Sequence, residues 1–135
     1  MNLNINYVSI FNQIVDEFFN ELMEIFPEEN KIKVQYSLFQ TISKINSKKV
    51  CNEFMIKSIP FLEKIAMRDD EFFIGNDIPF LKALNIQNIW TPELSEGTKK
   101  AIWRYIQSFF TIGVNITEMP LESYYIIKYI INYQN

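Results

Sequence analysis

The sequence predicts an all-α protein: one domain over residues 1–135 that folds as a compact bundle of five to seven short helices. Three observations predict this class. Apolar residues recur at intervals of three and four over long stretches, which is the spacing of one face of an α-helix. Prolines and small polar residues separate these stretches, where helices begin or end. The length of 135 residues suits one domain, and a content of 48% hydrophobic residues is enough for a core.

The first helix is expected at about 9–26. Its apolar face follows alternating steps of four and three residues: Phe11, Val15, Phe18, Leu22 and Ile25. Acidic and amide residues occupy much of the opposite face, so the stretch is strongly amphipathic. Pro27 ends it, because proline has no backbone N–H to continue the helix.

The second helix is expected at about 28–45, where Glu28 and Glu29 favour a helix N-terminus. Its apolar face is predicted to be Val34, Leu38, Ile42 and Ile45. A third helical stretch follows at about 48–67, with Ser47 as its N-cap. Because Pro60 falls inside that stretch, we expect a division near Ser58.

A short helix beginning near Asp77 is expected to carry Phe80, Leu81 and Leu84, and a long helix is expected after Thr91-Pro92, with Ser95 as a possible second cap. The last stretch, 121–133, is rich in β-prone Ile and Tyr. We prefer a helix there, because a lone strand would have no sheet to join. The predicted core is Phe11, Phe18, Leu22, Leu38, Ile42, Phe54, Leu62, Ile102, Ile106 and Phe109.

The composition excludes several classes of chemistry. The chain has no histidine, which removes the commonest general base and the commonest metal ligand. Its single cysteine, Cys51, forms neither an internal disulfide nor a multi-cysteine zinc site. The three glycines are too far apart for a phosphate-binding loop. We therefore expect no enzyme, no cofactor and no metal, and interpret the acidic run 69–71 as a solvated helix end or a cap.

No uncharged stretch between charged residues reaches the roughly 20 apolar residues of a membrane-spanning helix. The N-terminus lacks the basic region of a signal peptide, and a single cysteine fits a reducing compartment. These features predict a soluble intracellular protein.

Charge is unevenly distributed along the chain, whose net charge is −3. Residues 1–30 carry −6, residues 31–57 carry +5, and the remainder carries −2. The preferred interpretation is that the first two helices pack side by side with complementary charge. The alternative is a basic patch for nucleic acid or anionic lipid. Nucleic acid is the less favoured partner, because such domains are usually more basic and richer in arginine.

The 21 aromatic residues exceed what a small core needs, and they indicate a contact surface. For each of these aromatic residues, the alternative interpretation is ordinary packing in the core. The tryptophans lie close to Arg104 in the sequence, and tyrosines gather at the C-terminus. The candidate protein-interaction residues are Trp90, Trp103, Arg104, Tyr125, Tyr129 and Tyr133.

Three stretches carry a resemblance to a known group: 18–27, with Phe18-Phe19 and Phe26-Pro27, then 68–73, and then 90–105 with both tryptophans. Over about residues 10–112 the chain resembles short, uncharacterised α-helical proteins of nucleocytoplasmic large DNA viruses, the giant viruses of algae and amoebae. A composition rich in Ile and Asn agrees with an AT-rich viral genome. The resemblance implies no active-site residues.

The expected function is that of a non-enzymatic viral interaction module that binds a host or viral protein, in the host cytoplasm or the virion. One version is a groove that accepts an amphipathic helix, as in Bcl-2-like regulators, although their signature is absent. The alternative is a virion or assembly component that forms a homo-oligomer through the tyrosine-rich terminus. A third hypothesis is a nucleic-acid binder that uses the lysines of the basic segment: Lys31, Lys33, Lys44, Lys48, Lys49 and Lys57.

Overall fold

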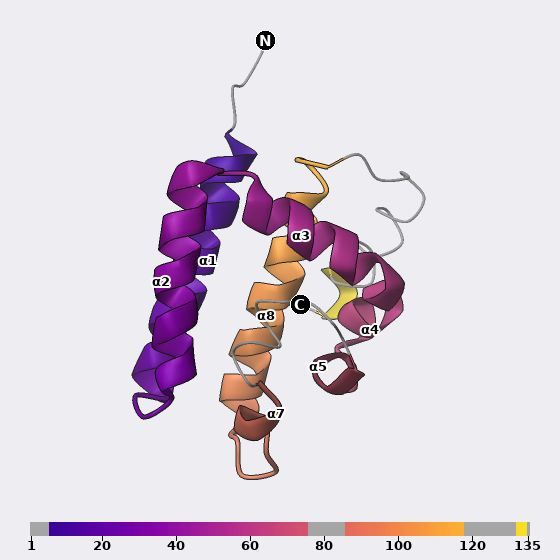
Figure 1. Ribbon diagram of the computed structural model, residues 1–135. Helices are drawn as coiled ribbons and strands as arrows, with labels where there is room; N and C mark the ends of the chain where they lie inside the picture. Colours follow the sequence, from indigo (N-terminus) through magenta and orange to yellow (C-terminus); the bar gives the residue numbers. More distant parts are fainter. Residues whose placement is uncertain (1–5, 76–85, 118–131, 135) are drawn as a thin grey trace.

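The structure is a computed structural model that describes residues 6–75, 86–117 and 132–134. Within these ranges the regular elements are helices, and no strand is present (Figure 1). The predicted all-α class is confirmed.

The first helix, α1, spans Tyr7–Ile25 and matches its prediction closely. The side chain of Asn6 caps it by accepting a hydrogen bond of 3.0 Å from the Ser9 backbone N–H. Its buried residues are Phe11, Val15, Phe18, Phe19 and Leu22. The helix ends just before Pro27, as the missing N–H of proline requires.

The second helix, α2, spans Asn30–Ile45, but the prediction of its buried face is wrong. Its buried residues are Ile32 and Phe39. Leu38, which we predicted in the core, is 47% exposed. Two apolar stripes compete on this helix, and the aromatic one faces inward because the Phe39 and Tyr36 rings lie 5.7 and 5.6 Å from the Phe19 ring.

The third stretch divides at Ser58, as predicted, into α3 (Lys49–Ser58), the 3-10 turn η1 (Ile59–Phe61) and α4 (Leu62–Met67). Ser47 is not the N-cap of α3. The cap position falls on Lys48, without a side-chain bond, and the Ser47 carbonyl instead accepts a hydrogen bond of 2.8 Å from the Asn12 amide.

Two short helices, α5 (Phe72–Gly75) and α7 (Ile86–Ile89), precede the long helix α8 (Glu96–Gly113). The Ser95 hydroxyl caps α8 by accepting a 3.1 Å hydrogen bond from the Thr98 N–H, which confirms that prediction. The helix predicted to carry Phe80, Leu81 and Leu84 lies outside the described residues, as does most of the stretch 121–133.

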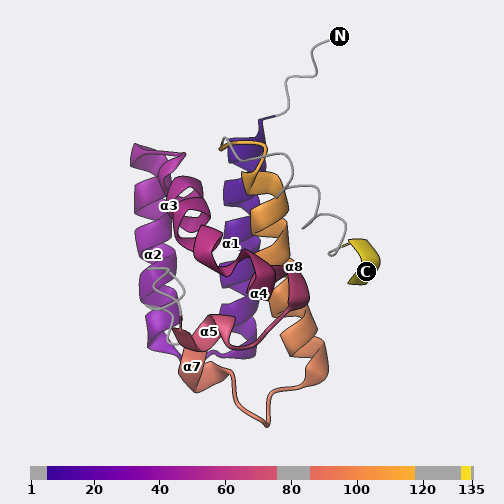
Figure 2. The ribbon, with the colours of Figure 1, turned by 90° about the vertical axis from the view of Figure 1, so that its right-hand side faces the viewer.

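Helix α8 packs against α1, α3 and α4, whereas α2 packs against α1 and α3. In Figure 2, α2 and α3 lie toward one side of the bundle and α8 toward the other. The core predictions that are confirmed are Phe11, Phe18, Leu22, Phe54, Ile102, Ile106 and Phe109. Ile42 and Leu62 are half-buried. Among the described residues, no helix is long and apolar enough to cross a membrane.

Candidate interaction surfaces

Trp103 lies inside the protein and is only 3% exposed. Its ring packs 4.8 Å from the ring of Phe73 and 5.8 Å from that of Phe72. Its indole N–H donates a 3.2 Å hydrogen bond to Asp70. Buried tryptophans usually find such an acceptor, so the position of Trp103 favours the core-packing interpretation for this residue.

Trp90 is the accessible member of the tryptophan pair, since it is half-buried. Its ring stacks 4.4 Å from Phe73 and lies edge-on to Trp103 at 6.4 Å. The Lys99 ammonium lies 5.9 Å from the centre of the same ring, within cation–π range. The Trp90 indole nitrogen is buried and has no hydrogen-bond partner among the described residues.

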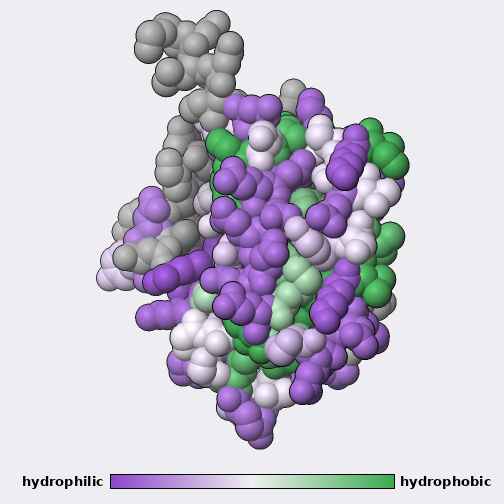
Figure 3. Space-filling view, turned by 90° about the vertical axis from the view of Figure 1, so that its left-hand side faces the viewer, coloured by the Kyte–Doolittle hydropathy of each residue, from purple (hydrophilic) through white to green (hydrophobic). Residues whose placement is uncertain are grey.

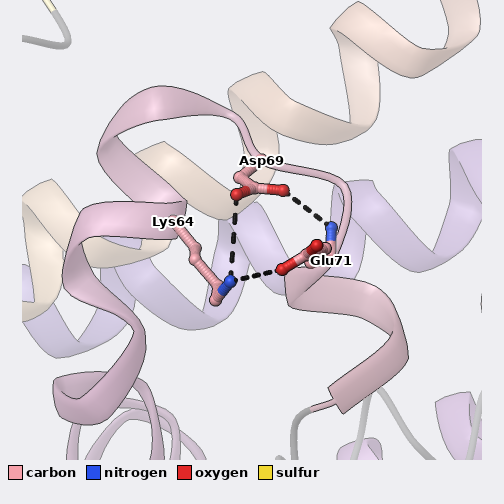
Figure 4. A network of polar contacts seen from close by, with 3 residues as sticks. All are labelled: Lys64, Asp69 and Glu71. Carbon is pink, nitrogen blue, oxygen red and sulfur yellow. Dashed lines mark hydrogen bonds and ion pairs between the residues drawn. The ribbon is translucent and has the colours of Figure 1, made fainter.

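Two residues of the acidic run 69–71, Asp69 and Glu71, are joined to Lys64 and to each other, as Figure 4 shows. The Lys64 ammonium lies 2.8 Å from Glu71 and 3.8 Å from Asp69. One Asp69 oxygen also accepts a 3.0 Å hydrogen bond from the Glu71 N–H. With Asp70 bonded to Trp103, each carboxylate of the run has a partner in the fold, which supports the structural interpretation of this motif.

A buried amide joins α8 to the end of α4, a feature that sequence reasoning missed. Gln107 is 2% exposed, and its amide N–H donates to the Ile65 carbonyl at 2.9 Å. Its oxygen accepts from the Arg68 Nε at 3.1 Å. Arg68 ends α4 in the left-handed conformation, with φ of 54°. Nothing in an isolated sequence marks a glutamine as buried, since glutamine is mostly a surface residue.

Arg104 points away from the tryptophans, because neighbouring helix positions face different sides. It lines a groove between α1 and α8 with a volume of about 330 Å³. We call this the α1–α8 groove, and its lining residues are Ile14, Glu17, Glu21, Ala101, Arg104, Tyr105 and Ser108. Burial, and then a hydrogen bond to Glu21, raise the pKa of Tyr105 to about 12. The groove therefore combines the apolar side chains of Ile14 and Ala101 with two carboxylates, a guanidinium and a neutral phenol.

Of the three candidate tyrosines near the C-terminus, the structure describes one. Tyr133 is 84% exposed, whereas Tyr125 and Tyr129 lie outside the described residues. Of the six candidate residues, the structure brings Trp90 and Trp103 together and sets Arg104 on a different face. Among the described candidates, Trp90, Arg104 and Tyr133 are accessible at the surface, while Trp103 is buried and packs against Trp90.

The outer face of α2 carries an apolar stripe whose residues belong to the predicted apolar face of this helix, and one of them, Leu38, was predicted in the core. Val34, Leu38 and Ile45 are 56%, 47% and 82% exposed, and their spacing of four and seven places them on one side of the helix. We call these three residues the α2 stripe. Lys31, Lys33 and Lys44 are exposed on the same helix. Figure 3, which views the side formed by α1 and α2, shows hydrophobic residues gathered along one edge of a largely hydrophilic face.

Helices α1 and α2 pack side by side, as expected, but opposite charges do not join them. Their polar link is the Tyr36 hydroxyl, which donates a 2.6 Å hydrogen bond to Asp16. Both helices are fully described, and no ion pair connects a carboxylate of α1 to a lysine of α2. The negative charges of α1 and the positive charges of α2 are therefore not paired with one another within this fold.

No protein-family model, no curated protein and no solved structure matches the chain. The fold and its surfaces define an all-α bundle with an apolar, lysine-bearing helix face and a groove of net negative charge. Its function is interpreted from these two surfaces.

Proposed function

We propose that this chain is a non-enzymatic viral module that binds a protein through the outer face of α2. The observation that carries the proposal is the α2 stripe, whose members are between 47% and 82% exposed. Single exposed apolar residues are normal on protein surfaces. Three on one helical face form the pattern with which a helix anchors in the groove of a partner.

The charge around the α2 stripe indicates the chemistry of the partner. Helix α2 carries Lys31, Lys33 and Lys44 and no acidic residue. Lysines beside an apolar stripe favour a partner whose apolar groove has an acidic rim, because such charges steer association and suppress wrong partners. Arg104 and the accessible part of Trp90 are secondary candidate contacts.

The absence of histidine supports a non-enzymatic role, since it removes the commonest general base. The resemblance to giant-virus proteins supports a viral origin, and with it a site of action in the host cytoplasm or the virion. The proposed partner is either a host protein or a second viral protein.

The experiment compares three immobilised proteins in extracts of algal or amoebal host cells, with and without infection. The first is the wild type, and the second replaces the stripe through Val34→Ser, Leu38→Ser and Ile45→Ser. The matched control removes the same number of exposed aliphatic residues elsewhere, through Ile25→Ser, Ile59→Ser and Met67→Ser. We expect a protein retained by the wild type and the control to be lost from the stripe variant.

The retained protein is then purified, and its affinity is measured by calorimetry. Loss of the stripe is expected to weaken binding by about tenfold or more, since hot-spot residues carry over about 1–2 kcal/mol each. Equal retention by the stripe variant and the control would contradict the proposal.

A further inference from the structure

We infer that the α2 stripe of one copy docks into the α1–α8 groove of a second copy, so that the protein assembles with itself head to tail. The inference rests on the proposed function and names the partner of the same α2 face. Both complementary surfaces belong to this chain and consist of described residues.

The first surface is convex, apolar and basic. Leu38 lies near the middle of α2, flanked along the stripe by Val34 and Ile45. Lys31 lies one turn before Val34, and Lys44 is next to Ile45. A partner surface therefore has to offer an apolar recess with negative charge around it.

The second surface is the α1–α8 groove, which combines apolar side chains with negative charge. Ile14 and Ala101 contribute apolar side chains to the lining of the α1–α8 groove, and Glu17 and Glu21 contribute negative charge from its α1 side. Its volume of about 330 Å³ falls in the range that accommodates a small group of atoms, such as an aliphatic side chain with a neighbouring lysine. Arg104 is also in the lining, and the net charge of the groove remains negative.

The charged residues of both surfaces are exposed to solvent. Helix α1 carries four carboxylates and no basic residue, whereas α2 carries three lysines and no acidic one. Glu17, Glu21, Lys31, Lys33 and Lys44 are all exposed, and no ion pair joins these two helices. A complementarity left unused within one copy is available between two copies.

The two surfaces do not overlap, because α2 contributes no residue to the lining of the groove. Each copy therefore presents a stripe and a groove at the same time. Such a contact joins different surfaces of identical chains, so it forms a ring where the rotation closes and a filament where it does not. This arrangement is consistent with an assembly component.

Sedimentation velocity over a series of concentrations tests the inference with two variants. The stripe variant carries Val34→Ser, Leu38→Ser and Ile45→Ser, and the groove variant carries Glu17→Lys and Glu21→Lys. The changed residues are exposed or lie at the groove, and circular dichroism and thermal melting verify that both variants fold. Glu28→Lys with Glu29→Lys is the matched control, because it makes the same change of charge away from the groove.

The wild type is expected to gain mass with concentration, and to associate about tenfold more weakly at high salt, because exposed charges are screened. Each variant alone is expected to remain monomeric, while the control associates like the wild type. Mixing the two variants provides the sharpest outcome. The intact groove of the stripe variant accepts the intact stripe of the groove variant, so a one-to-one pair forms and does not grow.

Any of three results would overturn the inference: the wild type stays monomeric, the groove variant associates like the wild type, or the mixture of variants does not pair. Wild-type protein that stays monomeric and co-floats with vesicles of anionic lipid would assign the α2 face to a membrane instead. If self-association fails while the stripe variant still loses a protein retained from extracts, the inference falls and the proposed function stands. If the stripe variant retains that protein as well, the proposed function falls independently.

Discussion

Helices α8 and α2 are both long and amphipathic, yet they use their apolar residues differently. Helix α8 packs against α1, α3 and α4 and buries Ile102, Trp103, Ile106, Phe109 and Phe110. Helix α2 packs against α1 and α3 and buries two residues, while the α2 stripe is exposed. An apolar stripe in a sequence therefore predicts a helix, but its burial depends on how many neighbours the helix has.

The largest expected difference between the two helices is in stability. Phe109→Ala on α8 removes a fully buried ring that packs 5.6 Å from Phe11 and from Phe54, and it is expected to lower the free energy of unfolding by about 3–5 kcal/mol. Leu38→Ala on α2 is expected to change it by less than about 1 kcal/mol, because the side chain is 47% exposed. Urea unfolding of both variants measures the contrast. Similar losses would show that α2 is as much a core helix as α8.

The next largest effect on stability is expected where α3 packs closely on α8. A Cβ atom at Gly113 would lie 2.9 Å from Cγ of Met55, so Gly113→Ala forces the methionine to move. We expect a loss of about 1–3 kcal/mol in the free energy of unfolding. Gly97→Ala is the matched control, because a Cβ there meets nothing within 4 Å. The control is expected to stabilise the helix by up to about 1 kcal/mol, so a stable Gly113→Ala protein would contradict the packing.

At the α1–α2 contact the expected effect is smaller. Tyr36→Phe removes the 2.6 Å hydrogen bond to Asp16 and is expected to cost about 0.5–1.5 kcal/mol in thermal or urea unfolding. Tyr7→Phe serves as the control, since Tyr7 lies at the start of α1, away from this contact. Equal behaviour of the two variants would show that the bond to Asp16 does not help to hold α2 on α1.

In the α1–α8 groove the expected change is in titration. Burial and the bond to Glu21 raise the pKa of Tyr105 to about 12, from an ordinary value of 10.0. The folded state favours the neutral phenol, so its stabilising contribution is complete below pH 10 and is lost as the pH rises through about 12. Ultraviolet titration of wild type and Tyr105→Phe checks this, because the variant should lack a phenolate that forms near pH 12. If the phenolate missing from the variant is one that forms near pH 10, the result would contradict the raised pKa of Tyr105.

Much of the fold was predictable because it depends on local signals. The periodicity of α1, the division at Ser58 and the Ser95 cap all follow from residues within a few positions of one another. The exposure of Leu38 was not predictable in this way. Two apolar stripes on α2 have similar helical spacing, and the choice between them depends on Phe19, which lies on another helix.

The candidate surfaces were predictable only in part. The segmental charge pattern predicted that the first two helices pack with complementary charge, but the carboxylates of α1 and the lysines of α2 form no ion pairs with one another. The tryptophans were recognised as distinctive, yet the burial of Trp103 depends on Asp70 and Phe73, which precede it by about thirty residues. The Gln107 contacts with Arg68 and Ile65 carry no local signal at all.

The central proposal is that the α2 stripe joins one copy of the chain to another and is not needed for folding. Its most direct test is sedimentation velocity of the wild type beside the variant with Val34→Ser, Leu38→Ser and Ile45→Ser, at rising concentration and matched helical content. We predict that the wild type gains mass while the variant remains a folded monomer. Identical sedimentation of the two proteins would contradict the claim.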